Sequence, residues 1–197
     1  MAIISREFYA RPALDVARDL LGCRLVRQIN QQRVSGIITE TEAYQGEQDL
    51  GCHAHVGLTP RTAIMYGPAG HAYIYFTYGM HWLFNVVTDL VNVPSAVLVR
   101  GIIPDEGVSE MAINRPYNAH KKDWLNGPAK LTQALLLDKE HNGCDLCTET
   151  SDLFIEAAHQ IPDSEVISTA RVGLNSVPEP WKSIPWRFLV KRNGAIS

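Results

Sequence analysis

Residues 71–85 read HAYIYFTYGMHWLFN, two runs of aromatic and apolar residues on either side of Tyr78-Gly79. A glycine-containing turn between two such runs predicts a β-hairpin. Six of the chain's sixteen Phe, Trp and Tyr residues lie between Tyr73 and Phe84, whereas a buried strand usually carries aliphatic side chains. We expect the ring at the tip, Tyr78, to be exposed and three others to form the core face: Phe76, Trp82 and Phe84.

The other expected strands follow in runs joined by tight turns, without regular alternation with helices. They cover residues 23–29, 33–44, 71–77, 80–88, 95–102, 152–157, 165–171 and 186–191. Helices are expected over 11–22, after Asn126-Gly-Pro128 and over 106–113, with a single turn after Thr59-Pro60. This order favours a largely antiparallel α+β domain over a parallel doubly wound one.

Length and composition indicate one folded domain. The chain has 197 residues, of which 46% are hydrophobic and 20% charged, close to the globular average. It contains no run of eighteen apolar residues, and its first seven residues become charged too soon for a signal peptide. We therefore expect an intracellular protein whose four cysteines stay reduced.

The charge balance bears on possible partners. A net charge of −3 argues weakly against a nucleic-acid partner without excluding one, since backbone phosphates are usually met by a basic surface. The first hundred residues contain eight Arg and no Lys. The planar guanidinium of Arg suits phosphates and stacked bases, although compositional drift explains the same count.

The segment Thr39-Glu-Thr-Glu42-Ala-Tyr44 contains the best candidates for chemistry. Because strand side chains alternate, Glu40, Glu42 and Tyr44 should project from one face. Carboxylates near an apolar face are costly unless they are paired or used, and glycoside chemistry often uses them as acid, base or nucleophile. The alternative is a strand end that reaches solvent, which we expect for Glu40 more than for Glu42.

Two groups of Cys and His residues raise the possibility of zinc. They are Cys52-His-Ala-His55 and Cys144-Asp-Leu-Cys147. Adjacent Cys52 and His53 rarely reach one metal ion, and the H-x-E and P-C-x-x-C motifs of zinc deaminases are absent. We therefore expect free thiols, no metal and no cofactor. The chain also lacks a P-loop and a G-x-S-x-G motif, which weakens nucleotide-triphosphatase and serine-hydrolase hypotheses.

A set of short motifs occurs in a specific order between about residues 6 and 190. They are Glu40-Thr-Glu-Ala-Tyr44, His53, Thr59-Pro-Arg61, Tyr73-Ile-Tyr-Phe-Thr-Tyr-Gly-Met80, Asn85, Val97-Leu-Val-Arg100, Gly127-Pro-Ala-Lys-Leu131 and Ala170-Arg-Val-Gly173. In these motifs the chain resembles the alkyladenine (3-methyladenine) DNA glycosylases of the methylpurine family. The resemblance implies a single DNA glycosylase domain over residues 1–197, with a curved, largely antiparallel sheet, flanking helices and a protruding β-hairpin.

The resemblance also implies a reaction, the hydrolysis of the N-glycosidic bond of a damaged purine rotated out of duplex DNA. Glu42 matches the general base that activates a water for attack on C1′. Arg100 and the backbone carbonyl of Val172 match groups that help hold this water. We find no well-placed lysine for a Schiff-base lyase step, and His53 and Glu40 are the only candidates for a general acid.

Other matched positions concern binding. The rings that enclose the flipped base are matched by Tyr44, His53 and Tyr75, and Asn85 matches the residue that disfavours the 2-amino group of guanine. Tyr78 matches the residue that fills the gap left in the duplex, and Arg61 and Lys130 lie where the DNA backbone is expected. The implied partner is double-stranded DNA containing damaged purines, bound by a monomer with no membrane association. The implied location is the cytoplasm, near the nucleoid, in a bacterium, or the nucleus in a eukaryote, and not outside the cell.

These roles constrain the hairpin. With a two-residue loop, Tyr78-Gly79, Tyr75 pairs with Trp82 and Asn85 falls on the opposite face. With a three-residue loop over 77–79 and Gly79 in the left-handed conformation, Tyr75 pairs with His81. One face then carries Tyr73, Tyr75, His81, Leu83 and Asn85. We predict the three-residue loop, because it lets Tyr75 and Asn85 line one pocket.

Two other functions stay open. The same rings, without a clear general acid, also suit a catalytically silent module that binds damaged DNA or other nucleic acid. The Cys and His residues leave a zinc enzyme as a third hypothesis. Release of free base from damaged duplex, and activity in the presence of a chelator, separate these hypotheses.

Overall fold

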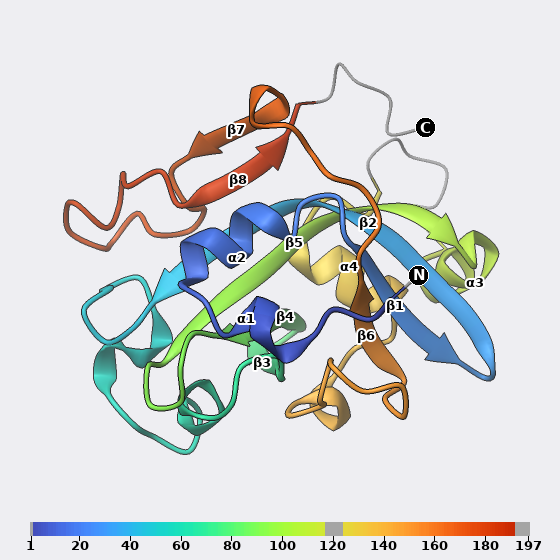
Figure 1. The fold of residues 1–197 in the computed structure, drawn as a ribbon, viewed down its shortest axis with the longest axis horizontal. Helices are drawn as coiled ribbons and strands as arrows, with labels where there is room; N and C mark the ends of the chain where they lie inside the picture. Colours follow the sequence, from blue (N-terminus) through green and yellow to red (C-terminus); the bar gives the residue numbers. More distant parts are fainter. Residues whose placement is uncertain (1, 117–123, 192–197) are drawn as a thin grey trace.

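The computed structural model describes residues 2–116 and 124–191, and its strands form one curled antiparallel sheet (Figure 1). The strand order is β3-β4-β5-β2-β1-β6, and β8 also pairs with β2 and carries β7 on its other edge. The bounds are β1 Arg24–Ile29, β2 Gln32–Gln45, β3 Ala72–Thr77, β4 His81–Thr88, β5 Ser95–Glu106, β6 Leu153–Glu156, β7 Val166–Thr169 and β8 Arg187–Val190. Each expected strand is present, and the α+β class with its antiparallel sheet is confirmed.

Strand β2 is the longest in the sheet and has two different neighbours along one edge. Its first half pairs with β1, and Glu40 to Glu42 pair with β8, while β5 runs along the opposite edge. The β2–β5 register shifts on both sides of Glu40. Irregularities of this kind bend a strand and redirect its side chains. The sheet therefore curves at the position where the candidate carboxylates lie.

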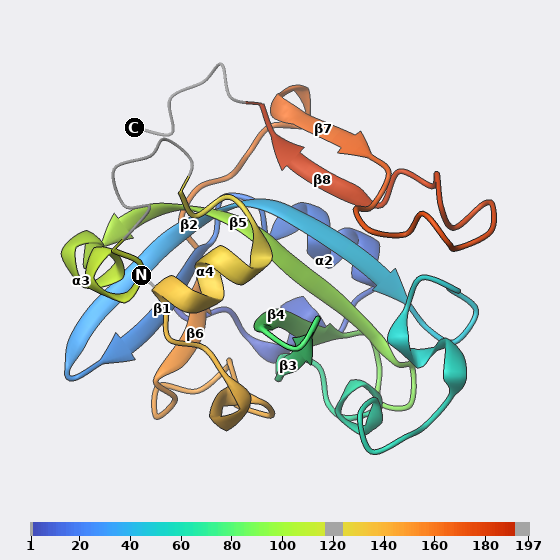
Figure 2. The same cartoon turned by 180° about the vertical axis from the view of Figure 1, so that it is seen from behind.

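The helices cover both faces of the sheet. Helix α2 (Ala13–Asp19) lies in front of β2 and β5 in Figure 1, and α4 (Pro128–Ala134) lies in front of the sheet in the reverse view of Figure 2. α2 buries Ala13, Val16 and Ala17, and α4 buries Leu131, Thr132 and Ala134. Spacings of three and four residues place such side chains on one helix face. The expected helix over 11–22 is thus shorter than predicted, and it begins directly after Pro12.

Shorter helical segments complete the fold. α3 covers Val108–Asn114, close to the expected 106–113, because β5 continues as far as Glu106. The turn expected after Thr59-Pro60 continues into a 3₁₀ helix, η2 (Ala63–Tyr66). The sequence did not predict α1 (Arg6–Tyr9) or η1 (His53–Val56), which are each one turn long. Among the described residues, no helix is both long enough and apolar enough to cross a membrane.

The hairpin of β3 and β4 has a three-residue loop, but one position later than predicted. Thr77 pairs with His81, so the loop is Tyr78-Gly79-Met80, and Tyr75 pairs with Leu83 instead of His81. Gly79 has φ +67°, as expected, and Tyr78 also adopts a left-handed φ of +52°. When the loop moves by one residue, each β3 residue pairs two positions further along β4. Because side chains alternate with a period of two, the same residues still share a face. The predicted shared face of Tyr73, Tyr75, His81, Leu83 and Asn85 is therefore preserved.

The predicted core face of the hairpin is only partly right. Phe84 is fully buried and Trp82 packs at the edge of the core, but Phe76 is 46% exposed. The ring of Phe76 lies 4.7 Å from that of Trp82, measured between centroids. The two strands extend beyond the body of the sheet, so residues near the loop share a face with the core without being covered by it.

Candidate active site

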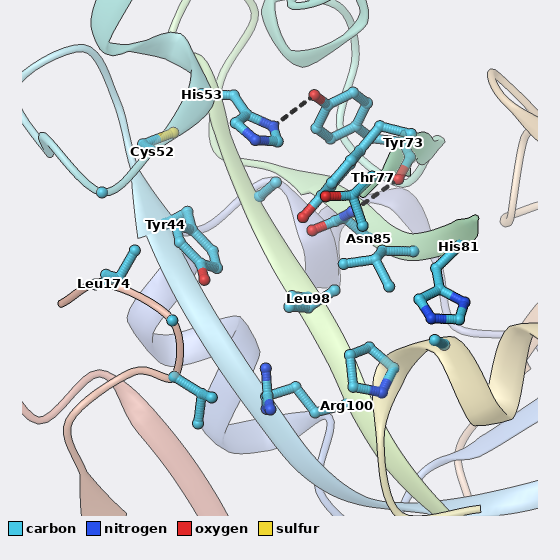
Figure 3. Close-up of a pocket in the computed structure, with 18 of the residues that line it drawn as sticks. Tyr44, Cys52, His53, Tyr73, Thr77, His81, Asn85, Leu98, Arg100 and Leu174 are labelled. Carbon is cyan, nitrogen blue, oxygen red and sulfur yellow. Dashed lines mark hydrogen bonds between the residues drawn. The ribbon is translucent and has the colours of Figure 1, made fainter. Parts of the chain in front are cut away.

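A cavity of about 360 Å³ opens on the face of the sheet that carries α4 (Figure 3). Its volume lies in the range of small-molecule sites. Strands β2 to β5, η1, the start of α4 and the segment 172–174 all contribute to its wall. The residues predicted from the sequence that line it are Tyr44, His53, Tyr75, Tyr78, Asn85, Arg100 and Val172. The fold thus brings together residues from most of the ordered motifs.

Glu42 has no exposed surface and lies directly behind three residues of the cavity wall, Tyr44, Arg100 and Val172, which it contacts. The backbone N–H of Val172 donates to Oε1 of Glu42 at 2.7 Å, and the Tyr44 hydroxyl donates to Oε2 at 2.8 Å. Nε of Arg100 lies 3.4 Å from Oε1. Val172 and Arg100 were expected beside a bound water, and both also contact the carboxylate. Each oxygen of Glu42 therefore has a donor in the folded protein.

The protonation of Glu42 reflects its burial. Burial raises the pKa of the Glu42 carboxyl above its ordinary value, and the negative charge of Glu40 adds to this rise. The charge of Arg100, the Val172 N–H and the Tyr44 hydroxyl oppose the rise in pKa without cancelling it. A carboxylate whose pKa is raised towards neutrality is a stronger base than an exposed one.

Glu40 is buried too, which makes the expectation of a solvated side chain wrong. Its Oε1 accepts hydrogen bonds from Nε of Arg100 and Nε of Arg187, each at 2.7 Å. Strand β8 supplies Arg187 from the far end of the chain, and the sequence alone does not pair it with β2. Because Glu40 is held between two guanidinium groups, it is a poor candidate for a general acid.

One wall of the cavity consists of packed rings. His53 meets Tyr75 edge to face, with 4.5 Å between centroids, and Tyr73 lies 5.4 Å from Tyr75. Nδ1 of His53 is 2.9 Å from the Tyr73 hydroxyl, as Figure 3 shows, and Nη2 of Arg61 is 3.3 Å from Nε2. A guanidinium can only donate, so Nε2 accepts and the ring proton lies on Nδ1. His53 is therefore a neutral imidazole that donates to Tyr73.

The environment of His53 keeps it neutral. Burial lowers the pKa of His53 to about 4, and the charges of Arg61 and His55 act in the same direction. At neutral pH the ring thus carries no charge and is unsuited to protonating a leaving group. The aromatic wall presents apolar faces to the cavity.

This low pKa predicts how stability depends on pH. The folded protein binds fewer protons at His53 than the unfolded chain does between pH 6.5, its ordinary pKa, and about pH 4. The contribution of His53 is complete above pH 6.5 and is lost as the pH falls through 4. The variant His53→Asn keeps a donor towards Tyr73 and cannot titrate, so it should lose less unfolding free energy than wild type between pH 7 and pH 4. Urea unfolding at both pH values measures this, and equal losses would contradict it.

An ion pair that the sequence did not predict anchors Tyr44. Arg171 is buried and bonds both oxygens of Asp49, at 2.5 and 2.8 Å, and its Nη1 donates to the carbonyl of Ala43 at 2.9 Å. Its guanidinium lies between the rings of Tyr44 and Trp186, at 4.7 and 5.2 Å from their centroids. The arrangement fixes the ring of Tyr44 and the segment that carries Val172. Arg171 belongs to the motif Ala170-Arg-Val-Gly173 found in the sequence, but only the tertiary structure shows that Asp49 is its partner.

Gly51 lets the loop after β2 lie close to this segment. A Cβ on Gly51 would lie 2.7 Å from Cδ1 of Leu174 and 2.8 Å from Nη2 of Arg171. Real Cβ atoms do not approach that closely. The loop therefore passes directly against Arg171 and closes one side of the cavity.

Asn85 lies at the back of the cavity and is almost fully buried. Its Nδ2 donates to the backbone carbonyl of Tyr73 at 2.9 Å, as marked in Figure 3. This bond fixes the orientation of the side-chain amide. Asn85 and Tyr75 line the same pocket, as the predicted face of the hairpin required.

Three residues were expected on the DNA-facing surface, and all are exposed. Tyr78 is 82% exposed at the hairpin tip, at the mouth of the cavity. Lys130 is exposed in the first turn of α4, next to Pro128 and Ala129 of the cavity wall. The guanidinium of Arg61 stacks over the Tyr75 ring, 5.1 Å from its centroid, besides contacting His53. Arg61 thus lies at the rim of the cavity.

The cysteines take part in packing. Within residues 2–116 and 124–191, no group of three or more His, Cys, Asp or Glu side chains is arranged to hold a metal ion. All four cysteines are free; Cys23 and Cys52 are buried, and Cys144 and Cys147 are half-buried. Burial raises the pKa of the Cys52 thiol to about 12. Cys52 is therefore a protonated thiol that lines the cavity beside His53.

Fold and site together place a buried carboxylate next to a cavity that is walled by aromatic rings. The sequence profile of the methylpurine-DNA glycosylases matches residues 7–194. The chain belongs to the methylpurine-DNA glycosylase family, so it is a DNA glycosylase of base-excision repair and its substrate is DNA.

Relatives of this chain match over nearly their whole length. A protein of Carboxydothermus hydrogenoformans is 43% identical over 195 residues, which cover 99% of this chain and 98% of the relative. One from Methanocella arvoryzae is 40% identical over 197 residues, covering 100% and 96%, and one from Myxococcus xanthus is 44% identical over 194 residues, covering 98% and 93%. Each bears the name "Putative 3-methyladenine DNA glycosylase".

Proposed function

We propose that the chain is a monofunctional DNA glycosylase that flips an alkylated or deaminated purine out of duplex DNA and hydrolyses its N-glycosidic bond. The observation that carries this proposal is Glu42, a fully buried carboxylate beneath a cavity walled by rings. Glu42 accepts a proton from water as the water oxygen forms a bond to C1′. The bonding electrons of the C1′–N bond leave with the purine, and the DNA retains an abasic site.

Neighbouring groups prepare this step. Arg100 and the backbone carbonyl of Val172 hold the attacking water, and the Val172 N–H and Tyr44 hydroxyl hold Glu42 itself in position. The fixed donors also keep the carboxylate from rotating away from the water. The protein acts as a monomer, and neither a metal ion nor a Schiff base takes part.

The pocket binds the extruded purine. Tyr44 forms one side, and Tyr75 and His53 form the other, while Asn85 at the back disfavours the 2-amino group of guanine. Rings on both sides favour a cationic alkylated purine by about 0.5–2 kcal/mol through cation–π interaction. Tyr78 fills the gap in the duplex, and Arg61 and Lys130 contact its backbone.

The surroundings of the two candidate acids bear on substrate preference. Purines alkylated at N3 or N7 are already cationic and leave without further protonation, whereas hypoxanthine and ethenoadenine leave poorly as anions. His53 is neutral because its pKa is lowered to about 4, and Glu40 is engaged by two guanidinium groups. The chain therefore prefers 3-methyladenine and 7-methylguanine to hypoxanthine.

A base-release panel tests this proposal. Duplexes that contain 3-methyladenine, 7-methylguanine, hypoxanthine or ethenoadenine are incubated with the protein, with and without EDTA, beside an undamaged duplex. We expect free base from the alkylated duplexes at rates that EDTA does not change. Release of hypoxanthine should be slower by about a hundredfold or more, which is the usual contribution of a general acid. Tight binding of damaged duplex without any release would instead support a silent binding module.

A further inference from the structure

Four charged side chains form a continuous row beneath the cavity: Arg187, Glu40, Arg100 and Glu42. Both guanidinium groups donate through Nε to the same oxygen, Oε1 of Glu40, at 2.7 Å. Nε of Arg100 also lies 3.4 Å from Oε1 of Glu42. Three strands supply the row, since β2 carries both carboxylates, β5 carries Arg100 and β8 carries Arg187.

In this row, two carboxylates compete for Arg100. Its Nε is 0.7 Å closer to Glu40 than to Glu42, because the two distances are 2.7 and 3.4 Å. The side chains of Glu40 and Glu42 are 7% and 0% exposed, so little solvent screens the competition. Arg187 shares the oxygen that holds Arg100. A stronger hydrogen bond from Arg187 to Oε1 of Glu40 should therefore weaken the hydrogen bond from Arg100 to the same oxygen.

We propose that Glu40 and Arg187 are positioning residues that determine where the Arg100 guanidinium lies between the two carboxylates, and so how far it neutralises Glu42. Arg187 acts through Glu40, without touching Glu42 by its side chain. The inference rests on the proposed role of Glu42 as the base. It assigns a task in the reaction to β8, the last strand of the described chain.

Other groups also face Glu42, and the test leaves them unchanged. They are the hydroxyl of Tyr44 on β2 and the N–H of Val172 on the adjacent segment, with the ring of Tyr75 on β3 further away. The charge of Arg171 lies over the Tyr44 ring and is paired with Asp49.

Two substitutions should shift the titration of Glu42 in opposite directions. Glu40→Gln removes a neighbouring negative charge and releases Arg100 towards Glu42, so the pKa of Glu42 should fall. Arg187→Gln removes a donor that shares Oε1 of Glu40 with Arg100, which draws Arg100 towards Glu40 and away from Glu42, so the pKa of Glu42 should rise by about one unit. Simple attraction through space predicts the same two signs, so the signs alone do not establish positioning.

The double variant separates the two explanations. If Arg187 acts through Glu40, Arg187→Gln should shift the pKa of Glu42 much less in the Glu40→Gln background than in wild type. If it acts directly through space, the two shifts should add. Strict additivity would overturn the proposal, as would a Glu42 titration that Glu40→Gln leaves unchanged. Should Arg187→Gln fail to fold, Arg187→Lys completes the cycle, because Lys keeps the charge but cannot reproduce the guanidinium geometry.

The titration is measured by ¹³C NMR of the Glu side-chain carboxyl carbons in the full chain, with the Glu42 signal assigned by its loss in Glu42→Gln. The matched control is Glu156→Gln, since Glu156 is also 6% exposed and also lies against two guanidinium groups, those of Arg33 and Arg24. It should lower the unfolding temperature and leave the Glu42 titration unchanged. This experiment needs no substrate. Non-additive shifts in a protein that releases no base would reject the proposed function and retain the positioning of Arg100.

Discussion

Replacing Glu42 by Gln should lower the rate of base release by about 10³-fold, because the amide cannot accept a proton from the attacking water. Gln keeps the size of the side chain: its carbonyl oxygen can still accept from the Val172 N–H, and its amide NH2 can donate to the oxygen of the Tyr44 hydroxyl. Binding of damaged duplex should therefore change little. Single-turnover release from 3-methyladenine duplex, at protein concentrations that saturate binding, measures the chemical step alone.

A stability measurement shows whether slow base release in Glu42→Gln results from loss of the folded structure. The folded pKa of Glu42 is raised by burial, so ionised Glu42 destabilises the folded protein as the pH rises through that pKa. Gln does not titrate, so Glu42→Gln should unfold at a higher temperature than wild type at pH 8, with the difference shrinking towards pH 4. A variant that is stable and binds DNA but releases no base isolates the general base. Release at the wild-type rate would exclude Glu42 from that role.

Replacing Tyr78 by Ala should weaken binding of damaged duplex about 5- to 150-fold, from the loss of one stacked ring worth about 1–3 kcal/mol. The ring is 82% exposed and contributes little to the core, so the unfolding temperature should hardly change. Both residues have a Cβ and bear the same strain at the left-handed φ of +52°. Fluorescence anisotropy with a labelled duplex measures the dissociation constant.

Tyr78→Phe is the matched control. It keeps the ring and removes only a hydroxyl at the exposed tip, so its affinity for damaged duplex should stay within about threefold of wild type. Undamaged duplex provides the second comparison, since it offers no stable gap for the ring. Equal affinities of Tyr78→Ala and wild type for damaged duplex would show that the tip does not enter the DNA.

The sequence allowed much of the sheet to be predicted. Its strands are short, rich in β-branched and aromatic residues, and bounded by turn residues, so local pattern specifies them. The loop of the hairpin was misplaced by one residue because Tyr78 adopts a conformation that local rules reserve for Gly, Asn and Asp. The predicted faces are still correct, because side chains alternate along a strand and the pairing is displaced by an even number of residues.

The site was harder to predict where it depends on distant partners. Glu42, Tyr44 and Asn85 lie on strands whose alternation is visible in the sequence, and they line or underlie the cavity as expected. Glu40 was expected in solvent because neither Arg100 nor Arg187 is near it in the chain. Arg171 and Asp49, 122 positions apart, were missed for the same reason. A charged side chain can be buried when an oppositely charged partner lies beside it, and here the partners are brought together only by the tertiary structure.

The two neighbours of β2 have a consequence for synthesis of the protein. Val172 reaches Glu42 across 130 positions and Arg187 reaches Glu40 across 147. The ribosome therefore synthesises most of the sheet well before it synthesises Val172, which bonds Glu42, and strand β8, which pairs with β2. A nascent chain that ends before Arg187 lacks a guanidinium group that donates to Glu40 in the folded protein. The surroundings of Glu40 and Glu42 are thus completed only after Val172 and Arg187 have been synthesised.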